Sequence, residues 1–343
     1  MKRKIPFLGI VFLLIFLAMM NSVKAQDIHF SQYAFSPLNL NPGMTGFYNG
    51  NYRFHFNNRT QWKAVTVPYS TTSISAEMLV KKRELKQDII SAGLIINRDK
   101  AGDSEFGTTQ LNLSIAYAKP INSKNNQFIS IGLQPGIAQR TINYTKLTFD
   151  NQFNGSSYDP NLPNQEQFDT RKFIFFDLGA GIYWDYIFKK NLKFNAGIAL
   201  FHLNNPKQTL LGNTDIKLDK KLTIFGNAEY AINNRFDIMP SFMYLKQGPY
   251  NEFDLGATVR FVKERSRINY TAINAGIFFR MKDAAFFNIG LDYKNCNLSV
   301  SYDINYSNLK PASNSRGGLE IALRYIINNA SPIQKREVPC MIF

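Results

Sequence analysis

Apolar and polar residues alternate along most of this chain, and the alternation has a period of two. In residues 297–309, which read NLSVSYDINYSNL, the even-numbered positions up to 306 are apolar and the odd-numbered positions are Asn, Ser or Asp. Since successive side chains of a β-strand point to opposite faces, this pattern predicts a strand with one apolar and one polar face. The same pattern recurs in residues 110–117, 252–261, 287–295 and 318–327.

Counting these segments predicts fourteen strands. They are longer than the roughly 5–6 residues that are typical of globular strands, but suit tilted membrane strands of about 9–11 residues. A soluble sandwich also alternates, yet aromatic residues gather at the segment ends, as in the interfacial girdles of membrane barrels. We therefore predict an all-β fold, a transmembrane antiparallel β-barrel of about 14 strands within residues 51–328. The predicted strands are 51–62, 69–82, 87–99, 106–119, 127–142, 171–187, 190–203, 217–231, 234–246, 249–264, 268–282, 284–295, 297–309 and 317–328.

The lengths of the connections predict which end of the barrel faces outward. Membrane barrels have short periplasmic turns and longer outer loops. If the N-terminus is periplasmic, the three longest gaps, 143–170, 204–216 and 310–316, all face outward, whereas the turns near 190 and 296 face the periplasm. The gap 143–170 is long enough to predict an outward-facing binding loop.

The first 25 residues have the layout of a cleaved secretory signal. A basic stretch, Lys2–Lys4, precedes an apolar run over residues 5–20, and small residues lead up to Ala25 and Gln26. This layout predicts a signal peptide over residues 1–25 that is cut between Ala25 and Gln26, with a retained membrane anchor as the alternative. Together with the barrel pattern, export predicts the cell outer membrane as the location.

Residues 26–50 do not fit the strand pattern. The stretch SQYAFSPLNLNPGMTGFYNG, residues 31–50, is too rich in Pro, Gly and Asn for a regular element, yet it carries many large apolar groups. Lipid cannot accept irregular backbone, because its N–H and C=O groups would stay unpaired. We therefore expect this segment to lie in the lumen or at the periplasmic mouth, and residues 329–343 to form a periplasmic tail.

Charge and composition narrow the kinds of partner. The formal charge is +15, and removal of the four basic residues of the signal leaves about +11. These basic residues are scattered, so an acidic protein or anionic lipid headgroups are expected as partners rather than nucleic acid. Cys296 and Cys340 could pair in an oxidising compartment, although two cysteines are a weak signal. His29, His55 and His202 lack metal-ligand spacing, and no cofactor is expected.

Catalytic and ion-binding patterns are weak. His55 shares a predicted strand face with Asn57 and Arg59, but the chain has no Gly-x-Ser-x-Gly elbow, which leaves a barrel hydrolase as a minor alternative. Residues 97–108 begin like a calcium loop, yet Thr108 stands where the bidentate Glu belongs. A turn-rich outer loop is the better interpretation of that stretch.

The order of residues around the first predicted strand resembles the PorP/SprF family of Bacteroidetes outer-membrane proteins. The resemblance covers essentially the whole chain after the signal. The tail keeps Cys340 and Phe343 of the family's Cys-Pro-x-Phe ending but lacks its Pro. The matching positions, of structural or partner-binding role, are Ser31, Tyr33, Leu38, Asn41, Pro42, Gly43, Gly46, Arg53, Gln61 and Trp62.

The resemblance implies a non-enzymatic outer-membrane component of type IX secretion and gliding motility. It implies that such a protein helps to export or anchor a partner such as a large adhesin. The partners that it implies are other secretion components or the C-terminal domain of a secreted adhesin. An outer-membrane porin or selective transporter is the alternative that the sequence pattern leaves open.

Overall fold

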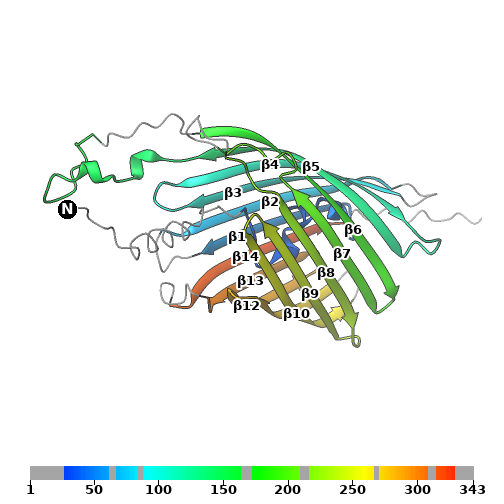
Figure 1. Ribbon diagram of the computed structural model, residues 1–343. Helices are drawn as coiled ribbons and strands as arrows, with labels where there is room; N and C mark the ends of the chain where they lie inside the picture. Colours follow the sequence, from blue (N-terminus) through cyan, green and yellow to red (C-terminus); the bar gives the residue numbers. More distant parts are fainter. Residues whose placement is uncertain are drawn as a thin grey trace, which may run out of the picture.

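The computed structural model describes residues 27–61, 67–82, 88–163, 172–208, 216–265, 270–307 and 314–328. Fourteen antiparallel strands close into a barrel, which confirms the predicted fold (Figure 1). The strands are β1 (Tyr52–Gln61), β2 (Tyr69–Lys82), β3 (Ile89–Ala101), β4 (Phe106–Pro120), β5 (Gln127–Thr141), β6 (Lys172–Lys189), β7 (Leu192–Phe201), β8 (Lys221–Ala231), β9 (Phe236–Gln247), β10 (Tyr250–Arg265), β11 (Tyr270–Arg280), β12 (Ala284–Tyr293), β13 (Cys296–Asn305) and β14 (Arg316–Ile327).

Each strand pairs with its neighbours in the sequence, and β1 pairs with β14 to close the ring. Tyr52 lies opposite Ile327 and Gln61 lies opposite Gly318, so the closing seam runs along the whole of β1. Closure leaves no strand edge with unpaired backbone groups, which a membrane demands of a spanning sheet.

The alternation of the sequence separates the two faces of the wall. On β13, for example, Val300 is 41% exposed on the outer face, whereas Ser301 is 1% exposed on the inner face. Large apolar side chains therefore cover the outside, and serine, threonine, amide and charged side chains fill the inside. Among the described residues, no helix combines the length and the apolar character needed to span a membrane.

The two ends of the barrel differ in their connections. We call the end with connections 142–171 and 202–220 the long-loop rim; the former carries the short helices η3 (Tyr144–Lys146) and η4 (Asp150–Gln152). The opposite end, where β6–β7 and β12–β13 are joined by 190–191 and 294–295, is the short-turn rim.

Some boundaries differ from the predicted ones. Cys296, expected in a turn, is the first residue of β13, because its backbone still pairs with Tyr293 and Tyr325. The polar stretch 97–108 is mostly strand, since Asn97 lies on the inner face of β3 and the turn occupies only residues 102–105. β8 begins at Lys221, not at residue 217.

Candidate functional site

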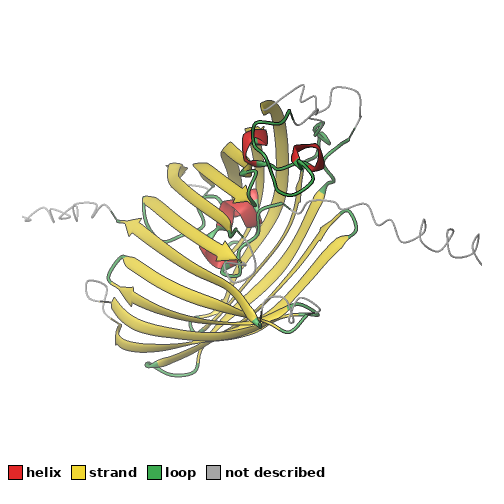
Figure 2. Ribbon diagram, turned by 90° about the vertical axis from the view of Figure 1, so that its left-hand side faces the viewer, coloured by secondary structure: helices red, strands yellow, loops and turns green. Residues whose placement is uncertain are grey.

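Residues 27–50, here called the luminal segment, pass through the inside of the barrel. The backbone N–H of Asp27 donates to Gln247 at the long-loop end of β9. Gly50, at the other end, lies against Ile326 near the short-turn end of β14. Figure 2 shows the strands surrounding the short helices of this segment. The chain therefore enters at one rim and leaves at the other.

Three short helices shape the luminal segment: η1 (Tyr33–Phe35), α2 (Pro37–Leu40) and η2 (Pro42–Met44). Pro37 and Pro42 stand at first helical positions, where the missing N–H costs no hydrogen bond. The Asn41 side chain caps η2 by accepting the Gly43 N–H at 2.7 Å. The prolines and the Asn41 cap thus leave fewer backbone N–H groups of this irregular segment without a hydrogen-bond partner.

Asn41 also fixes the segment to the wall. Its side-chain nitrogen donates to two backbone carbonyls of β6 and β7, at 2.9 and 3.3 Å. The wall opposite carries Gly132, Gly181 and Gly197, and a Cβ on any of them would overlap the segment. These glycines form a seat for residues 41–43, because the backbone of Pro42 and Gly43 lies against Gly132 and the Asn41 side chain lies against Gly181 and Gly197, where a side chain would not fit.

A charged cluster holds the first part of the segment. Glu320 of β14 accepts the backbone N–H groups of Ser31 and Gln32 at 2.8 and 3.0 Å. The Ser31 hydroxyl donates to Asp303, whose carboxylate pairs with Arg59 at 2.8 Å. All these side chains are buried, so every hydrogen bond that they make replaces one with water.

Arg53 holds the last part of the segment. Its guanidinium forms two hydrogen bonds of 2.8 Å with Glu77 of β2, the fork geometry that makes arginine–carboxylate pairs strong. The same arginine donates to the Phe47 carbonyl at 3.2 Å and lies over the Tyr48 ring. Glu77 in turn accepts the Gly46 N–H at 3.1 Å.

Three wall residues hold Asp27, at the start of the luminal segment. We call this group the Asp27 anchor; it consists of Lys221, His202 and Asp177. The Lys221 ammonium lies 2.5 Å from the Asp27 carboxylate, and His202 lies between Asp177 at 2.9 Å and Asp27 at 3.4 Å. Burial alone would lower the pKa of His202, but the two carboxylates outweigh it and raise the pKa to about 9. Burial alone would raise the pKa of Asp27, but Lys221 and His202 hold it well below its usual value.

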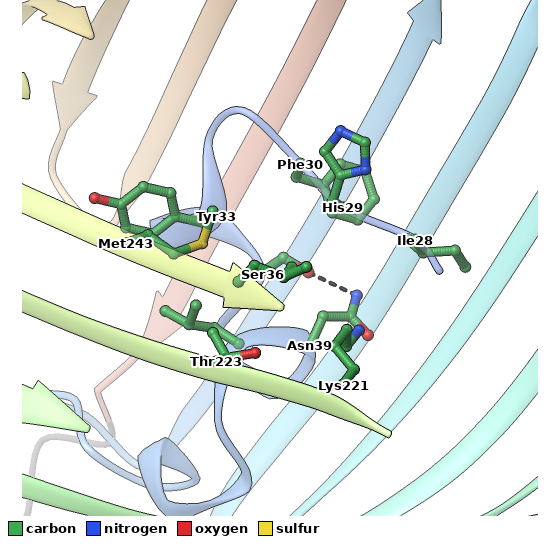
Figure 3. Close-up of a pocket in the computed structure, with 11 residues that line it drawn as sticks. Ile28, His29, Phe30, Tyr33, Ser36, Asn39, Lys221, Thr223 and Met243 are labelled. Carbon is green, nitrogen blue, oxygen red and sulfur yellow. Dashed lines mark hydrogen bonds between the residues drawn. The ribbon is translucent and has the colours of Figure 1, made fainter. Parts of the chain in front are cut away.

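Apolar contacts complete the attachment. Tyr33 and Leu40 of the segment pack with Tyr183, Phe225 and Met243 of the wall. Figure 3 shows Tyr33 beside Met243, with Thr223 and Lys221 on the neighbouring strand and the hydrogen bond between Asn39 and Ser36. The segment and the wall therefore share a buried apolar cluster, like the hydrophobic core of a globular domain.

The luminal segment separates two chambers. The short-turn chamber has a volume of about 670 Å³ and is lined by Phe47, Phe128 and Tyr183 among others. The long-loop chamber, of about 710 Å³, is lined by polar residues such as Asp27 and Arg140 and by apolar ones such as Phe106. No described residue lines both chambers.

The structure brings most of the predicted family-motif residues together at the contact between segment and wall. Gln61 instead lies at the long-loop rim, at the end of β1. Ala25, Gln26, Trp62, Cys340 and Phe343 lie outside the described residues. The motif residues that meet at the contact are Ser31, Tyr33, Leu38, Asn41, Pro42, Gly43, Gly46 and Arg53.

The wall residues that receive the segment were not predicted. The alternation identifies Glu320 and Asp303 only as polar positions of a two-faced strand, and it does not single out Glu77. Their acidic character was the available signal, since a carboxylate on a buried strand face needs a partner. The positions of those partners depend on contacts between residues far apart in the sequence.

The weaker candidates show no catalytic or metal geometry. His55 is buried on the inner face opposite Ser75, and neither of its ring nitrogens has a hydrogen-bond partner within the described ranges. Cys296 is a free thiol in the part of the chain that the structure describes. In the same residues, no group of three His, Cys, Asp or Glu side chains could hold a metal ion.

Comparison with known proteins gives one family and a set of barrels. The family model described as type IX secretion system membrane protein PorP/SprF matches residues 22–325. No protein of curated function matches the sequence.

Solved barrels resemble the chain in fold. The toluene transporter TbuX of Ralstonia pickettii is 8% identical with a TM-score of 0.51, over 85% of this chain and 94% of that one. A deltaS2S3 mutant of the TodX monoaromatic hydrocarbon channel is 8% identical with a TM-score of 0.49, over 88% and 95%. At such identity the likeness concerns the fold alone.

Proposed function

This chain belongs to the PorP/SprF family of type IX secretion system membrane proteins, and on that premise we propose that it assists the export or surface retention of a partner protein. Its place is the outer membrane, where the apolar outer face of the barrel meets lipid. The partner is a secretion component or the C-terminal domain of a secreted protein such as a large adhesin. The role is structural, and no catalytic step is assigned to the chain.

The observation that carries this proposal is the closure of the lumen. The luminal segment is bound along its length by Lys221, Glu320, the glycine seat and Arg53, and it leaves two chambers that share no described lining residue. A barrel that is filled in this way suits a protein that binds a partner at a mouth better than a passive pore.

The orientation follows from the two rims. We propose that the short-turn rim faces the periplasm and the long-loop rim faces outward, as in barrels with short periplasmic turns. Cleavage after Ala25 would then leave a new N-terminus close to Asp27, at the outward rim and not in the periplasm as assumed from the sequence, although β1 still begins at the short-turn rim. The partner contacts either rim, and the basic excess of the chain favours an acidic domain through steering.

Deletion of the gene tests the proposal. We expect the surface-exposed proteome to lose one or more type IX clients, and expression of the intact chain to restore them. An unchanged surface proteome together with normal gliding would refute the role in secretion.

A selective transporter is the second candidate. Two chambers inside a barrel whose fold resembles a toluene transporter favour it. Single-channel recording in planar bilayers separates the two functions. A steady conductance of the intact chain supports transport, whereas a silent barrel supports the docking role.

A further inference from the structure

We infer that the short-turn chamber is a dead-end docking pocket for a short, extended polypeptide segment that carries apolar or aromatic side chains. The inference rests on the proposed function for the existence of a protein partner, and it goes further by assigning the site and the chemistry of the segment. Three features of the chamber support the inference: its walls, its charged groups and its closed floor.

Aromatic side chains line the chamber in two groups, one beside β5 and β6 and one on β11 and β12. The ring of Phe47 packs edge-on against Tyr183 at 4.8 Å and against Phe128 at 6.3 Å between ring centres. A second pair, Phe278 and Phe286, is stacked at 4.9 Å. All five rings line the chamber, so apolar side chains of a bound segment would find aromatic surface there.

Neutral polar side chains form a belt around the same chamber, beside the charged groups Asp185, Lys193, Glu229, Arg260 and Arg324. Each of the strands β7 to β13 contributes at least one amide or hydroxyl side chain to the lining. Two of the amides, Asn288 and Asn297, have a buried side-chain oxygen without a hydrogen-bond partner among the described residues. The belt consists of Asn195, Asn227, Ser241, Thr258, Asn274, Asn288, Asn297 and Ser299.

This belt decides between classes of ligand. An extended peptide presents alternating N–H and C=O groups, which amides and hydroxyls can meet as donors and acceptors. A hydrocarbon would leave the side-chain oxygens of Asn288 and Asn297 buried and unpaired, which costs free energy for each of them. The belt therefore favours a polypeptide over a purely apolar molecule.

Charge adds a preference for a carboxylate. Arg260 is engaged by Glu229 at 2.8 Å, but Arg324 lies 3.4 Å from Asp292 and keeps 36% of its side chain exposed. Arg324 also lies over the Phe35 ring, with 5.8 Å between the guanidinium carbon and the ring centre. A guanidinium on an aromatic platform suits a carboxylate of an acidic side chain or of a chain terminus.

The floor and the mouth define how a segment would enter. Leu40 and Met44 of the luminal segment form part of the lining, so a chain that enters cannot pass on to the other chamber while the segment is seated. Among the described connections at this rim, 190–191 and 294–295 have two residues each and are too short to reach across the mouth. A volume of about 670 Å³ is within the roughly 300–1,000 Å³ of ligand pockets, which admits a few residues but no folded domain.

Photocrosslinking in cells that secrete type IX clients tests the inference. p-Benzoylphenylalanine at Phe128 probes the short-turn chamber, and the same probe at Phe106 probes the long-loop chamber as a control. We expect the Phe128 probe alone to give an adduct with a protein whose surface level falls when the gene is deleted. Mass spectrometry should map that adduct to a short segment with apolar side chains.

Filling the chamber provides the matched control. Thr258→Trp adds volume to the short-turn chamber, and Ala101→Trp adds it to the long-loop chamber. We expect the first variant to reduce the Phe128 adduct at least tenfold and the second to reduce it less than twofold. Heat-modifiable migration in gels checks that each barrel folds, and Arg324→Gln tests the carboxylate contact without adding volume, with an expected reduction of at least threefold.

Several outcomes would overturn the inference. One is an adduct only with lipid or a small molecule, and another is an adduct only with residues 329–343 of the same chain. Equal loss from Thr258→Trp and Ala101→Trp, or no Phe128 adduct while clients still reach the surface, would overturn it as well. In these cases the role in secretion stands, because that role fails only if gene deletion leaves the surface proteome unchanged.

Discussion

Replacing Gly132 by alanine tests the seat of the luminal segment directly. A Cβ at this position would overlap the Pro42 carbonyl carbon and the Gly43 nitrogen, far inside the 3.0 Å that real Cβ contacts keep. Both atoms belong to the backbone of η2, so no side-chain rotation relieves the overlap. The segment must shift out of its seat or the wall must bend.

The size of the effect follows from the cost of overpacking. One extra methyl group in a tightly packed site costs roughly 1–3 kcal/mol. If that cost falls on the seated state alone, the displaced state gains population by about 5- to 150-fold. We therefore expect Gly132→Ala to raise the fraction of time that single barrels conduct in planar bilayers by a factor within this range.

A second glycine supplies the control. Gly290 also faces the lumen, but a Cβ there would approach its neighbours no closer than 3.3 Å and would not meet the luminal segment. Gly290→Ala should therefore behave like the parent chain. Equal currents from Gly132→Ala and Gly290→Ala would refute the idea that the seat keeps the lumen closed.

Three further predictions concern the charged contacts. Because the pKa of His202 is raised from 6.5 to about 9, its stabilisation of roughly 3 kcal/mol is complete below pH 6.5 and is lost as the pH rises through about 9. Denaturant unfolding at pH 6 and pH 10 should show this loss, and His202→Asn, which tolerates the φ of 58°, should abolish it. Glu320→Ala should lower the free energy of unfolding by about 2–5 kcal/mol, because it leaves the buried N–H donors of Ser31, Gln32 and Asn57 without an acceptor. Glu320→Gln keeps an acceptor oxygen and should lower the free energy of unfolding less. Lys100 and Lys146 lower the pKa of Glu105 to about 2. Glu105→Gln should nevertheless leave the denaturation midpoint unchanged, because solvent screens an ion pair at the surface.

Each of these predictions has an outcome that contradicts it. A pH dependence that survives in His202→Asn would assign it to other groups. Equal losses from Glu320→Ala and Glu320→Gln would mean that the negative charge matters more than the hydrogen bonds. A lower midpoint for Glu105→Gln would show that this exposed ion pair contributes more than such pairs usually do.

The barrel could be predicted from the sequence because its signal is local. Apolar and polar residues must alternate in a strand with one face to lipid and one to the lumen, so β13 can be recognised from about ten residues of sequence. The strand ends were less certain, as at Cys296, because they depend on whether the neighbouring strand continues.

The luminal seat could be predicted only in part. Its backbone chemistry excluded the lipid, and that argument led to the lumen or its mouth. In the sequence, however, Gly181 looks like any glycine within a strand, since nothing near it points to Asn41. Ser31 and Glu320 are separated by 289 positions, so their hydrogen bond cannot be inferred from any local pattern.

The path of residues 27–50 also constrains how the protein assembles. A chain that enters at one rim and leaves at the other cannot be inserted sideways once the β1–β14 seam is paired. Its contacts include both strands of that seam, through Arg53 and Arg59 on β1 and Glu320 on β14. Because these contacts join the segment to β1 and to β14, they help to hold the two strands in register. The segment that fills the barrel thus also stabilises the seam that closes it.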